Sequence, residues 1–287
     1  MPEVLRLSAF AIEPTGGNPA GVVLDARGLD DAAMVRIARD VGYSETAFVV
    51  DPPDGQISAT GVVRAGVRYF SPRAEVPFCG HATIALAVAL AERTGARTFV
   101  FTTPVGDIEL TAERGEHGVE VSFTSVEPRV RSLPASVLAQ LLDVLGLAVD
   151  DLDTRYEPLE SFAGNWHPIV VVADVEVFNQ FRFSPAEVAA LMSSNGWTGT
   201  VTILHERSPG VFGARNLFPV GRITEDPATG SAAASVGAYL RALGQVGPDQ
   251  EILIHQGEHV GRPSILRVRV PANGGVIVRG GARTIED

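Results

Sequence analysis

The fold is decided by a short apolar stretch, residues 76–93, which reads VPFCGHATIALAVALAER. Between Ala82 and Ala91 it contains no charged residue, and small and aliphatic side chains occupy nearly every position. We predict a helix over about residues 82–93, stopped by Gly95. A helix that is apolar on nearly every side must be surrounded by protein. Short strands on either side of it must therefore enclose it.

A second segment of the same kind begins about 150 residues later, at residues 225–244, EDPATGSAAASVGAYLRALG. The segments that precede the two helices also match in order. Each half begins with a Gly-Asn turn, Gly17-Asn18 and Gly164-Asn165, and continues with a valine-rich strand, an amphipathic helix and further strands. A repeated order at this spacing predicts two domains of like architecture, each with strands curled around one central helix.

The fold class is therefore α+β, with two pseudo-symmetric domains. We expect an N-terminal domain at residues 1–128, which a last strand at 276–287 could complete, and a C-terminal domain at 129–275. Residues 125–136, SVEPRVRSLPAS, contain two prolines and alternating charge, and we predict a linker there. Two helix ends related in this way could point into one shared cleft, where we expect the active site.

Composition excludes several classes of function. The 287 residues carry a net charge of −11, which repels phosphate backbones and anionic membranes, so we expect no nucleic-acid or membrane partner. The apolar runs are shorter than the ~20 residues that a membrane helix needs. The N-terminus lacks a signal-peptide pattern, and one cysteine excludes an internal disulfide. These features predict a cytoplasmic protein.

The N-terminus of each buried helix is a candidate anion site. Its first N–H groups have no intrahelical partner, and the helix dipole makes this end positive. Gly80 and Gly230 would let a ligand approach these amides closely. A small carboxylate is therefore the expected ligand.

Three polar residues near these helix starts could do chemistry. Glu45, in YSETAF, lies at the edge of an apolar strand; it is either a solvated loop carboxylate or a general acid or base. Asp226 precedes Pro227, a pattern that predicts a helix cap followed by proline at the first helical position. His81 is either a structural histidine or part of the anion site.

Cys79 raises the question of thiol catalysis. Some two-domain racemases use one thiol from each half, but Cys79 is the only cysteine, and Thr229 occupies the matching position in the second half. We expect Cys79 to be a small buried side chain. His255 and His259 form an i,i+4 pair without a third ligand, so we predict no metal site. Phosphate-loop and Rossmann glycine patterns are also absent, so we predict no cofactor.

Five motifs in order resemble the PhzF-like family of the diaminopimelate epimerase superfamily. They are FAIEPTGGNPAGVVLDA, SETAFV, YFSPRAEVPFCGHATIALA, EDPATGSAAASVGAYL and QGEHVGRPSIL. The resemblance implies two epimerase-type domains, each a strand barrel around a helix, that face each other across a cleft. It also implies a homodimer. The sequence Cys79-Gly-His-Ala differs from the Ala-Gly-His-Pro that is common in phenazine-pathway members.

The resemblance further implies roles for individual residues. Glu45 would shuttle a proton, and His81 and Asp226 would line the same site. The substrate-binding residues would be Gly80, Gly230, Ser231, Thr229 and Asn18.

We therefore expect a cofactor-independent isomerase that moves a proton on a small carboxylate-bearing substrate. Two alternatives remain at this point. One is a racemase or epimerase that uses Cys79 as its one thiol, and the other is a non-catalytic protein that binds a small carboxylate.

Overall fold

The first apolar stretch forms helix α2 (Gly80–Thr94), which begins two residues earlier than predicted. Eleven consecutive residues, His81–Ala91, are buried, so this helix has no solvent face over most of its length. Gly95 ends it with a φ of 73°, a left-handed conformation that glycine adopts without steric cost.

In the computed structural model, which describes residues 2–13, 15–52, 61–115 and 118–286, the chain divides into two units. The first comprises residues 1–124 and 279–287, and the second comprises residues 125–278. None of the helices in these described ranges is long and apolar enough to cross a membrane.

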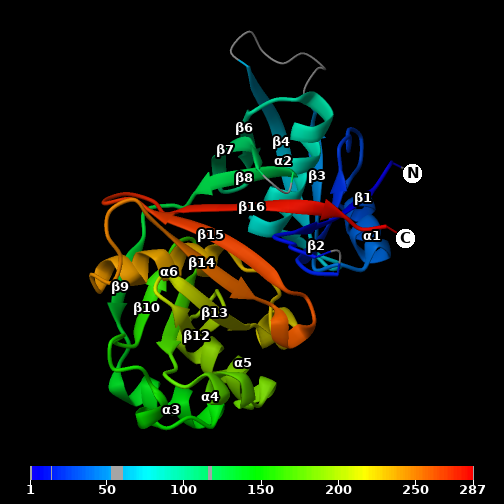
Figure 1. Cartoon of the computed structure of the whole chain (residues 1–287). Coiled ribbons are helices and arrows are strands. Elements are labelled where there is room, and N and C mark those ends of the chain that lie inside the picture. Colours follow the sequence, from blue (N-terminus) through cyan, green and yellow to red (C-terminus); the bar gives the residue numbers. More distant parts are fainter. Residues whose placement is uncertain (1, 14, 53–60, 116–117, 287) are drawn as a thin grey trace. The chain divides into compact units, whose positions relative to one another are not determined.

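The first unit is a closed barrel around α2 (Figure 1). Its strands follow the order β1-β2-β3-β4-β6-β7-β8-β16, and β16 pairs back to β1. A short strand, β5, lies outside this order and pairs antiparallel with the end of β4. The strands are β1 (Leu5–Ala9), β2 (Asn18–Val23), β3 (Glu45–Asp51), β4 (Val62–Phe70), β5 (Glu75–Val76), β6 (Thr98–Thr103), β7 (Gly106–Gly115), β8 (Gly118–Thr124) and β16 (Ile277–Thr284).

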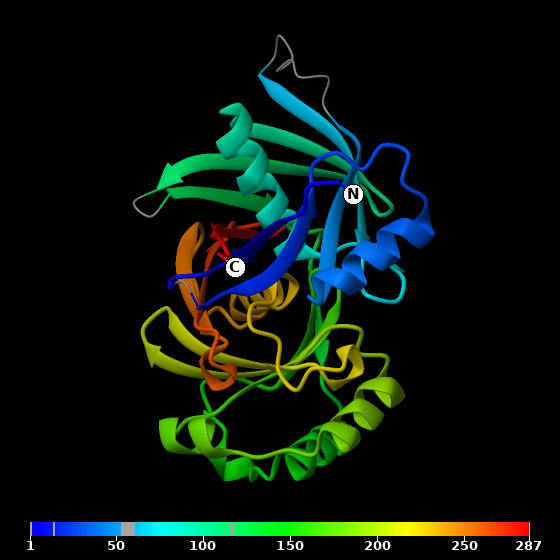
Figure 2. The same ribbon diagram turned by 90° about the vertical axis from the view of Figure 1, so that its right-hand side faces the viewer.

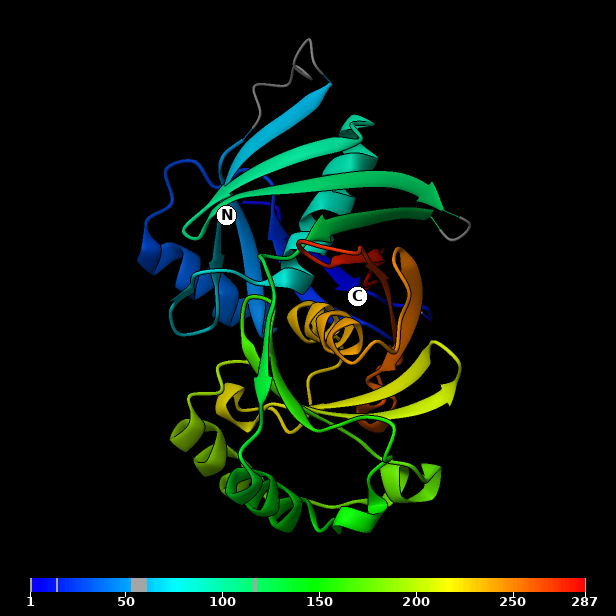
Figure 3. The same cartoon turned by 90° about the vertical axis from the view of Figure 1, so that its left-hand side faces the viewer.

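The second unit wraps its strands around helix α6 (Gly230–Ala242). The strand order is β15-β14-β13-β12-β11-β10-β9, and strands from both ends of this order, β9 and β15, contact α6. Figure 3 shows α6 running between these strands. The strands are β9 (Arg129–Ser132), β10 (Leu159–Phe162), β11 (Trp166–Val171), β12 (Val201–Ser208), β13 (Val211–Leu217), β14 (Gln250–Gln256) and β15 (Ser264–Val270).

The two units repeat one pairing pattern. In the first, β1–β2, β3–β4 and β6–β7 are antiparallel, whereas β2–β3 and β4–β6 are parallel. In the second, β10–β11, β12–β13 and β14–β15 are antiparallel, whereas β11–β12 and β13–β14 are parallel. Each parallel pair needs a long crossover, and helices occupy these crossovers in both units. The predicted α+β fold is confirmed.

The remaining helices cover the outer faces of the strands. In the first unit, α1 (Asp31–Val41) packs on β3 and β4 through Met34 and Ala38 (Figure 2). In the second unit, three helices share an apolar core with β11 and β12. These helices are α3 (Ala135–Leu145), α4 (Val175–Gln180) and α5 (Pro185–Asn195).

The predicted linker at residues 125–136 is wrong beyond its first four residues: residues 125–128 lie outside helices and strands, where the chain passes from the first unit to the second. Residues 129–132 form strand β9, which pairs with β10, and helix α3 begins at Ala135. Pro134 immediately precedes α3 with a φ of −58°, a value that suits the start of a helix. Pro134 therefore marks the boundary between two elements of the second unit, whereas Pro128 immediately precedes β9, the first strand of that unit.

Candidate active site

Strand register brings Glu45 to the start of α2. β3 and β4 are antiparallel with Thr46 opposite Phe70, so β4 ends beside the beginning of β3. The chain then enters α2, whose first turn therefore lies close to Glu45, the first residue of β3. This topology joins residues that are more than 30 positions apart in the sequence.

Glu45, Cys79 and His81 form one cluster at this place. The Sγ atom of Cys79 lies 3.6 Å from Oε2 of Glu45 and 3.3 Å from Nδ1 of His81. Nε2 of His81 lies 3.6 Å from the same Glu45 oxygen and 3.5 Å from the Ser44 hydroxyl. The Glu45 side chain is 22% exposed, whereas that of His81 is 8% exposed. The carboxylate is therefore the member of the cluster that a ligand can reach most easily.

The first turn of α2 keeps backbone donors available for an anion. Cys79 is the N-cap residue, and its side chain does not cap the helix. Its carbonyl oxygen accepts bonds from both the N–H and the hydroxyl of Thr83, which anchors the turn. The first N–H groups of an α-helix lack intrahelical acceptors, so they can bind an anion beside Glu45.

The predicted cap at the second buried helix is wrong. α6 begins at Gly230 with Thr229 as its N-cap residue, whereas Asp226 and Pro227 precede the helix in a non-helical segment. Oδ2 of Asp226 accepts a 2.5 Å hydrogen bond from the Thr229 hydroxyl. Asp226 therefore holds the residue that precedes the helix and does not cap the helix itself.

Gln256, at the end of β14, fixes this segment from the other side. Its amide nitrogen donates to the Asp226 carbonyl at 2.6 Å and to the Thr229 hydroxyl at 2.9 Å. Its amide oxygen accepts the Thr229 N–H at 3.2 Å. We did not predict this residue individually, although it begins the motif QGEHVGRPSIL. These contacts set the start of α6 more strongly than the local Asp-Pro pattern does.

His167, in β11, positions Ser231 in the first turn of α6. Nδ1 of His167 accepts the Thr200 N–H at 3.0 Å, because a backbone N–H can only donate. Burial lowers the pKa of His167 to about 4, so the ring is neutral at pH 7 and Nε2 carries its hydrogen. Nε2 then donates to the Ser231 hydroxyl oxygen at 3.2 Å. The serine hydrogen is thereby left to donate to a further acceptor.

A glycine makes room for the His167 ring. A Cβ atom at Gly199 would lie 2.3 Å from the ring, closer than any packing allows. The sequence did not reveal His167 as a functional candidate, because Thr200 and Ser231 are 33 and 64 positions away from it.

The structure places the other predicted ligand-binding residues at the first positions of a strand and of the two buried helices. Asn18 is the buried first residue of β2 and pairs with Ala9. Gly80 and Gly230 are the first residues of α2 and α6. Within the first unit, Glu45 pairs with Ala20 of the same strand β2.

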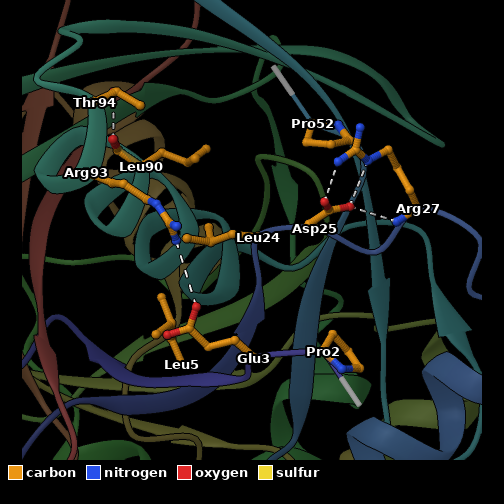
Figure 4. Close-up of a pocket in the computed structure, with 10 residues that line it drawn as sticks. All are labelled: Pro2, Glu3, Leu5, Leu24, Asp25, Arg27, Pro52, Leu90, Arg93 and Thr94. Atoms are coloured by element: carbon orange, nitrogen blue, oxygen red, sulfur yellow. Dashed lines mark hydrogen bonds and ion pairs between the residues drawn. The ribbon is translucent and has the colours of Figure 1, made fainter. Parts of the chain in front are cut away.

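A cavity of about 830 Å³ in the first unit is lined by a different set of residues (Figure 4). It contacts the last turn of α2, roughly 15–20 Å along the helix from the first turn. Its charged side chains form pairs, Asp25 with Arg27 and Glu3 with Arg93. The lining residues are Pro2, Glu3, Leu5, Leu24, Asp25, Arg27, Pro52, Leu90, Arg93 and Thr94. The predicted site residues do not line this cavity.

The sequence of this chain is similar to those of known proteins. A family model described as phenazine biosynthesis-like protein, PhzC-PhzF, matches residues 7–287. An isomerase of Mesorhizobium japonicum is 32% identical over 94% of this chain and 91% of its own. A trans-2,3-dihydro-3-hydroxyanthranilate isomerase of Pseudomonas fluorescens is 29% identical over 96% of each chain.

Solved structures agree with these sequence matches. A phenazine biosynthesis protein of the PhzF family from Bacillus anthracis superposes with a TM-score of 0.84 and 26% identity, covering 99% of this chain and 96% of that one. A hydroxyproline epimerase from Agrobacterium vitis, with trans-4-hydroxy-L-proline bound, gives a TM-score of 0.63 at 13% identity, covering 98% and 90%. The epimerase resemblance concerns the fold alone.

Proposed function

This chain belongs to the phenazine biosynthesis-like PhzC-PhzF family and is an isomerase, and we propose that it moves a proton between two carbons of a small conjugated carboxylate, with Glu45 as acid and base. Its isomerase relatives act on small-molecule substrates. The choice of Glu45, the type of substrate and the roles of the other residues are the proposed part.

The observation that supports this proposal is the environment of Glu45. Its carboxylate is 22% exposed and lies 3.6 Å from Nε2 of His81, at the first turn of a buried helix. A general base must be within reach of a substrate and be held in one orientation. The partial exposure of Glu45 lets a substrate reach its carboxylate, and the contacts with His81 and Cys79 hold that carboxylate in one orientation.

The proposed step conserves the composition of the substrate. Glu45, as a carboxylate, takes a proton from a carbon next to an activating group, and the electron pair of that C–H bond delocalises into the conjugated system. The resulting carboxylic acid then returns the same proton to a different carbon. His81 orients the carboxylate throughout. General acid–base catalysis of this kind contributes roughly 10²–10⁴-fold to the rate.

In the second unit, the start of α6 has the features of a carboxylate-binding site. Thr229 is its N-cap residue without a side-chain cap, so the first N–H groups can donate to an anion. The Ser231 hydroxyl, which His167 orients, adds a donor. We propose that Gly230 and Ser231 hold the substrate carboxylate, and that Asp226 and Thr229 shape this site through their mutual hydrogen bond.

The test is hydrogen exchange at carbon in deuterated water. The purified protein is incubated with trans-2,3-dihydro-3-hydroxyanthranilate, other conjugated carboxylates and a metabolite extract, and deuterium incorporation is measured by mass spectrometry. Glu45→Gln should reduce exchange by roughly 10²–10⁴-fold, because the amide cannot accept the proton. Its circular dichroism spectrum should match that of the unchanged protein.

The matched control is Glu109→Gln, which neutralises an exposed glutamate of β7 in the same unit. It should retain the exchange activity. Wild-type exchange rates in a folded Glu45→Gln protein would contradict the proposed role. Ligand binding without exchange for every candidate would instead favour the non-catalytic carboxylate binder.

The proximity of Cys79 to Glu45 keeps one alternative open, a racemase that uses a single thiol. The Sγ atom lies in the same cluster, so it could contact the same substrate. The Cys79→Ala variant distinguishes the two mechanisms, since alanine cannot exchange a proton.

We also propose a cytoplasmic homodimer, a prediction that rests on the family resemblance and on composition. Light scattering at micromolar concentration measures the mass. A value that corresponds to one 287-residue chain would exclude the dimer.

A further inference from the structure

The cluster of Glu45, Cys79 and His81 has the geometry of a metal site. Oε2, Sγ and Nε2 form a triangle with sides of 3.6 Å, 3.6 Å and 3.8 Å. Two ligands of a tetrahedral zinc ion are roughly 3.3–3.6 Å apart, given bond lengths of about 2.0–2.3 Å. The observed sides exceed this range by at most a few tenths of an ångström, which small side-chain rotations can remove.

The chemistry of the three donors selects a class of ion. A thiolate, an imidazole and a carboxylate together suit Zn²⁺ and its spectroscopic substitute Co²⁺, whereas Mg²⁺ and Ca²⁺ prefer oxygen ligands alone. Three protein ligands also leave a fourth position for water, as in open zinc sites. The exposed part of Glu45 gives an ion access from solvent.

We infer that Glu45, Cys79 and His81 bind a divalent zinc-type ion, and that the bound ion inhibits the isomerase. On binding, the Cys79 S–H bond breaks, a sulfur–metal bond forms and one proton is released to solvent. No oxidation occurs. The ion bonds to Oε2 of Glu45, and its positive charge makes this carboxylate a much weaker base toward a substrate proton. The inhibitory part rests on the proposed role of Glu45, whereas the binding part does not.

The charges around the cluster determine whether the binding of a cation is electrostatically favourable. The positive end of the α2 dipole opposes a cation, by about 0.3–1 kcal/mol in exposed settings. The two negative ligands, the Cys79 thiolate and the Glu45 carboxylate, neutralise the charge of a divalent ion in full. Direct ligation therefore outweighs the dipole.

The spacing of possible ligands in the sequence did not predict this site. A search for metal ligands by spacing found the pair His255 and His259, which has no third ligand nearby in the sequence. The cluster instead joins Glu45 to a Cys-Gly-His segment 34 positions later.

The experiment uses the whole untagged protein and Co²⁺ as the probe. Cys79 is the only thiol in the chain, so a thiolate-to-cobalt charge-transfer band in the near ultraviolet can arise only at this site. We expect such a band to saturate at one cobalt ion per chain and to disappear when Zn²⁺ is added. Zn²⁺ should also protect Cys79 from alkylation by a thiol reagent.

Three variants and one control test the ligand set. Cys79→Ala should abolish the band. His81→Gln and Glu45→Gln should each weaken cobalt binding at least 10-fold, because loss of even an outer-shell partner costs about 10–100-fold. His259→Gln should leave binding unchanged. Circular dichroism checks that each variant is folded.

Two results would overturn the proposal. One is the absence of a charge-transfer band in the folded wild-type protein at millimolar Co²⁺. The other is cobalt affinity in His81→Gln and Glu45→Gln equal to that of the wild type. Saturable binding at these three residues together with undiminished exchange activity in the zinc-loaded protein would leave the site standing and would instead contradict the proposed role of Glu45.

Discussion

The burial of His167 predicts a specific loss of stability in acid. The ring is fully buried in the second unit, where Nδ1 accepts the Thr200 N–H and Nε2 donates to Ser231. Desolvation is the main cause that lowers its pKa, from 6.5 to about 4, while a hydrogen bond that the protonated ring can donate to the Thr200 carbonyl oxygen, 3.1 Å from Nδ1, acts in the opposite direction. The folded protein therefore keeps this histidine neutral under conditions in which the unfolded chain protonates it.

The size of the stability loss follows from the difference between the pKa of His167 in the folded protein and in the unfolded chain. Because the folded pKa lies below the unfolded value, the contribution of His167 to stability is complete above pH 6.5 and is lost as the pH falls to about 4. Each pKa unit corresponds to about 1.4 kcal/mol, so the loss is about 3 kcal/mol across this window. In His167→Gln this part of the pH dependence should vanish, because the amide does not titrate. At pH 7.5 the variant should be about 1–3 kcal/mol less stable through imperfect hydrogen bonding.

Urea unfolding between pH 7.5 and pH 4, followed by tryptophan fluorescence, measures these quantities. Trp166 and Trp197 are the only tryptophans, and both lie in the second unit, so the signal reports on the unit that contains His167. The control is His259→Gln: this histidine is more exposed, and although partial desolvation and Arg215 also lower its pKa, its replacement should alter the pH dependence less than that of the fully buried His167. Equal slopes of stability against pH for the wild type and His167→Gln would refute the reasoning.

Two further predictions concern the thiol and a buried ion pair. Cys79→Ala should keep most exchange activity and resist thiol reagents; a folded variant as inactive as Glu45→Gln would favour the one-thiol mechanism. Glu225→Ala should cost about 3–5 kcal/mol of unfolding free energy in urea, because it leaves Arg215, 2.6 Å from Glu225 and 6% exposed, as an uncompensated buried charge. Glu258→Ala, which removes a more exposed pair, should cost less than about 1 kcal/mol, and equal losses for both variants would contradict this view.

Much of the fold could be predicted from the sequence because its two central helices are unusual. Few sequences are apolar on every side of a helix, and two of them at matching places indicated a repeat. The pairing between strands was harder to predict from the sequence. The register of β3 on β4, for example, depends on side-chain packing and not on local pattern. The error at residues 129–136, where the structure has a strand and the start of a helix, had a local cause. Pro128 and Pro134 were interpreted as signs of an irregular segment, whereas Pro134 immediately precedes a helix.

The candidate site, too, could be predicted only in part. Glu45 and His81 were chosen individually, and the structure brings them within 3.6 Å. Asp226 was expected to cap a helix because Asp-Pro suits a helix start, but contacts from Gln256 place the start at Gly230. Long-range partners of this kind have no sequence signal in a single chain. The roles of these residues in catalysis remain predictions.

The closing strand of the first barrel has a consequence for synthesis. Residues 282–284 of β16 pair with residues 7–9 of β1, so the first unit closes only after the second unit and β16 have been synthesised. Until residues 282–284 have been synthesised, β1 lacks this neighbour, and its backbone N–H and C=O groups on that side remain unsatisfied by the sheet. The second unit, in contrast, is built from the continuous residues 125–278. A chain that stops before β16 would therefore contain an open first barrel, with an exposed strand edge on which aggregation could begin.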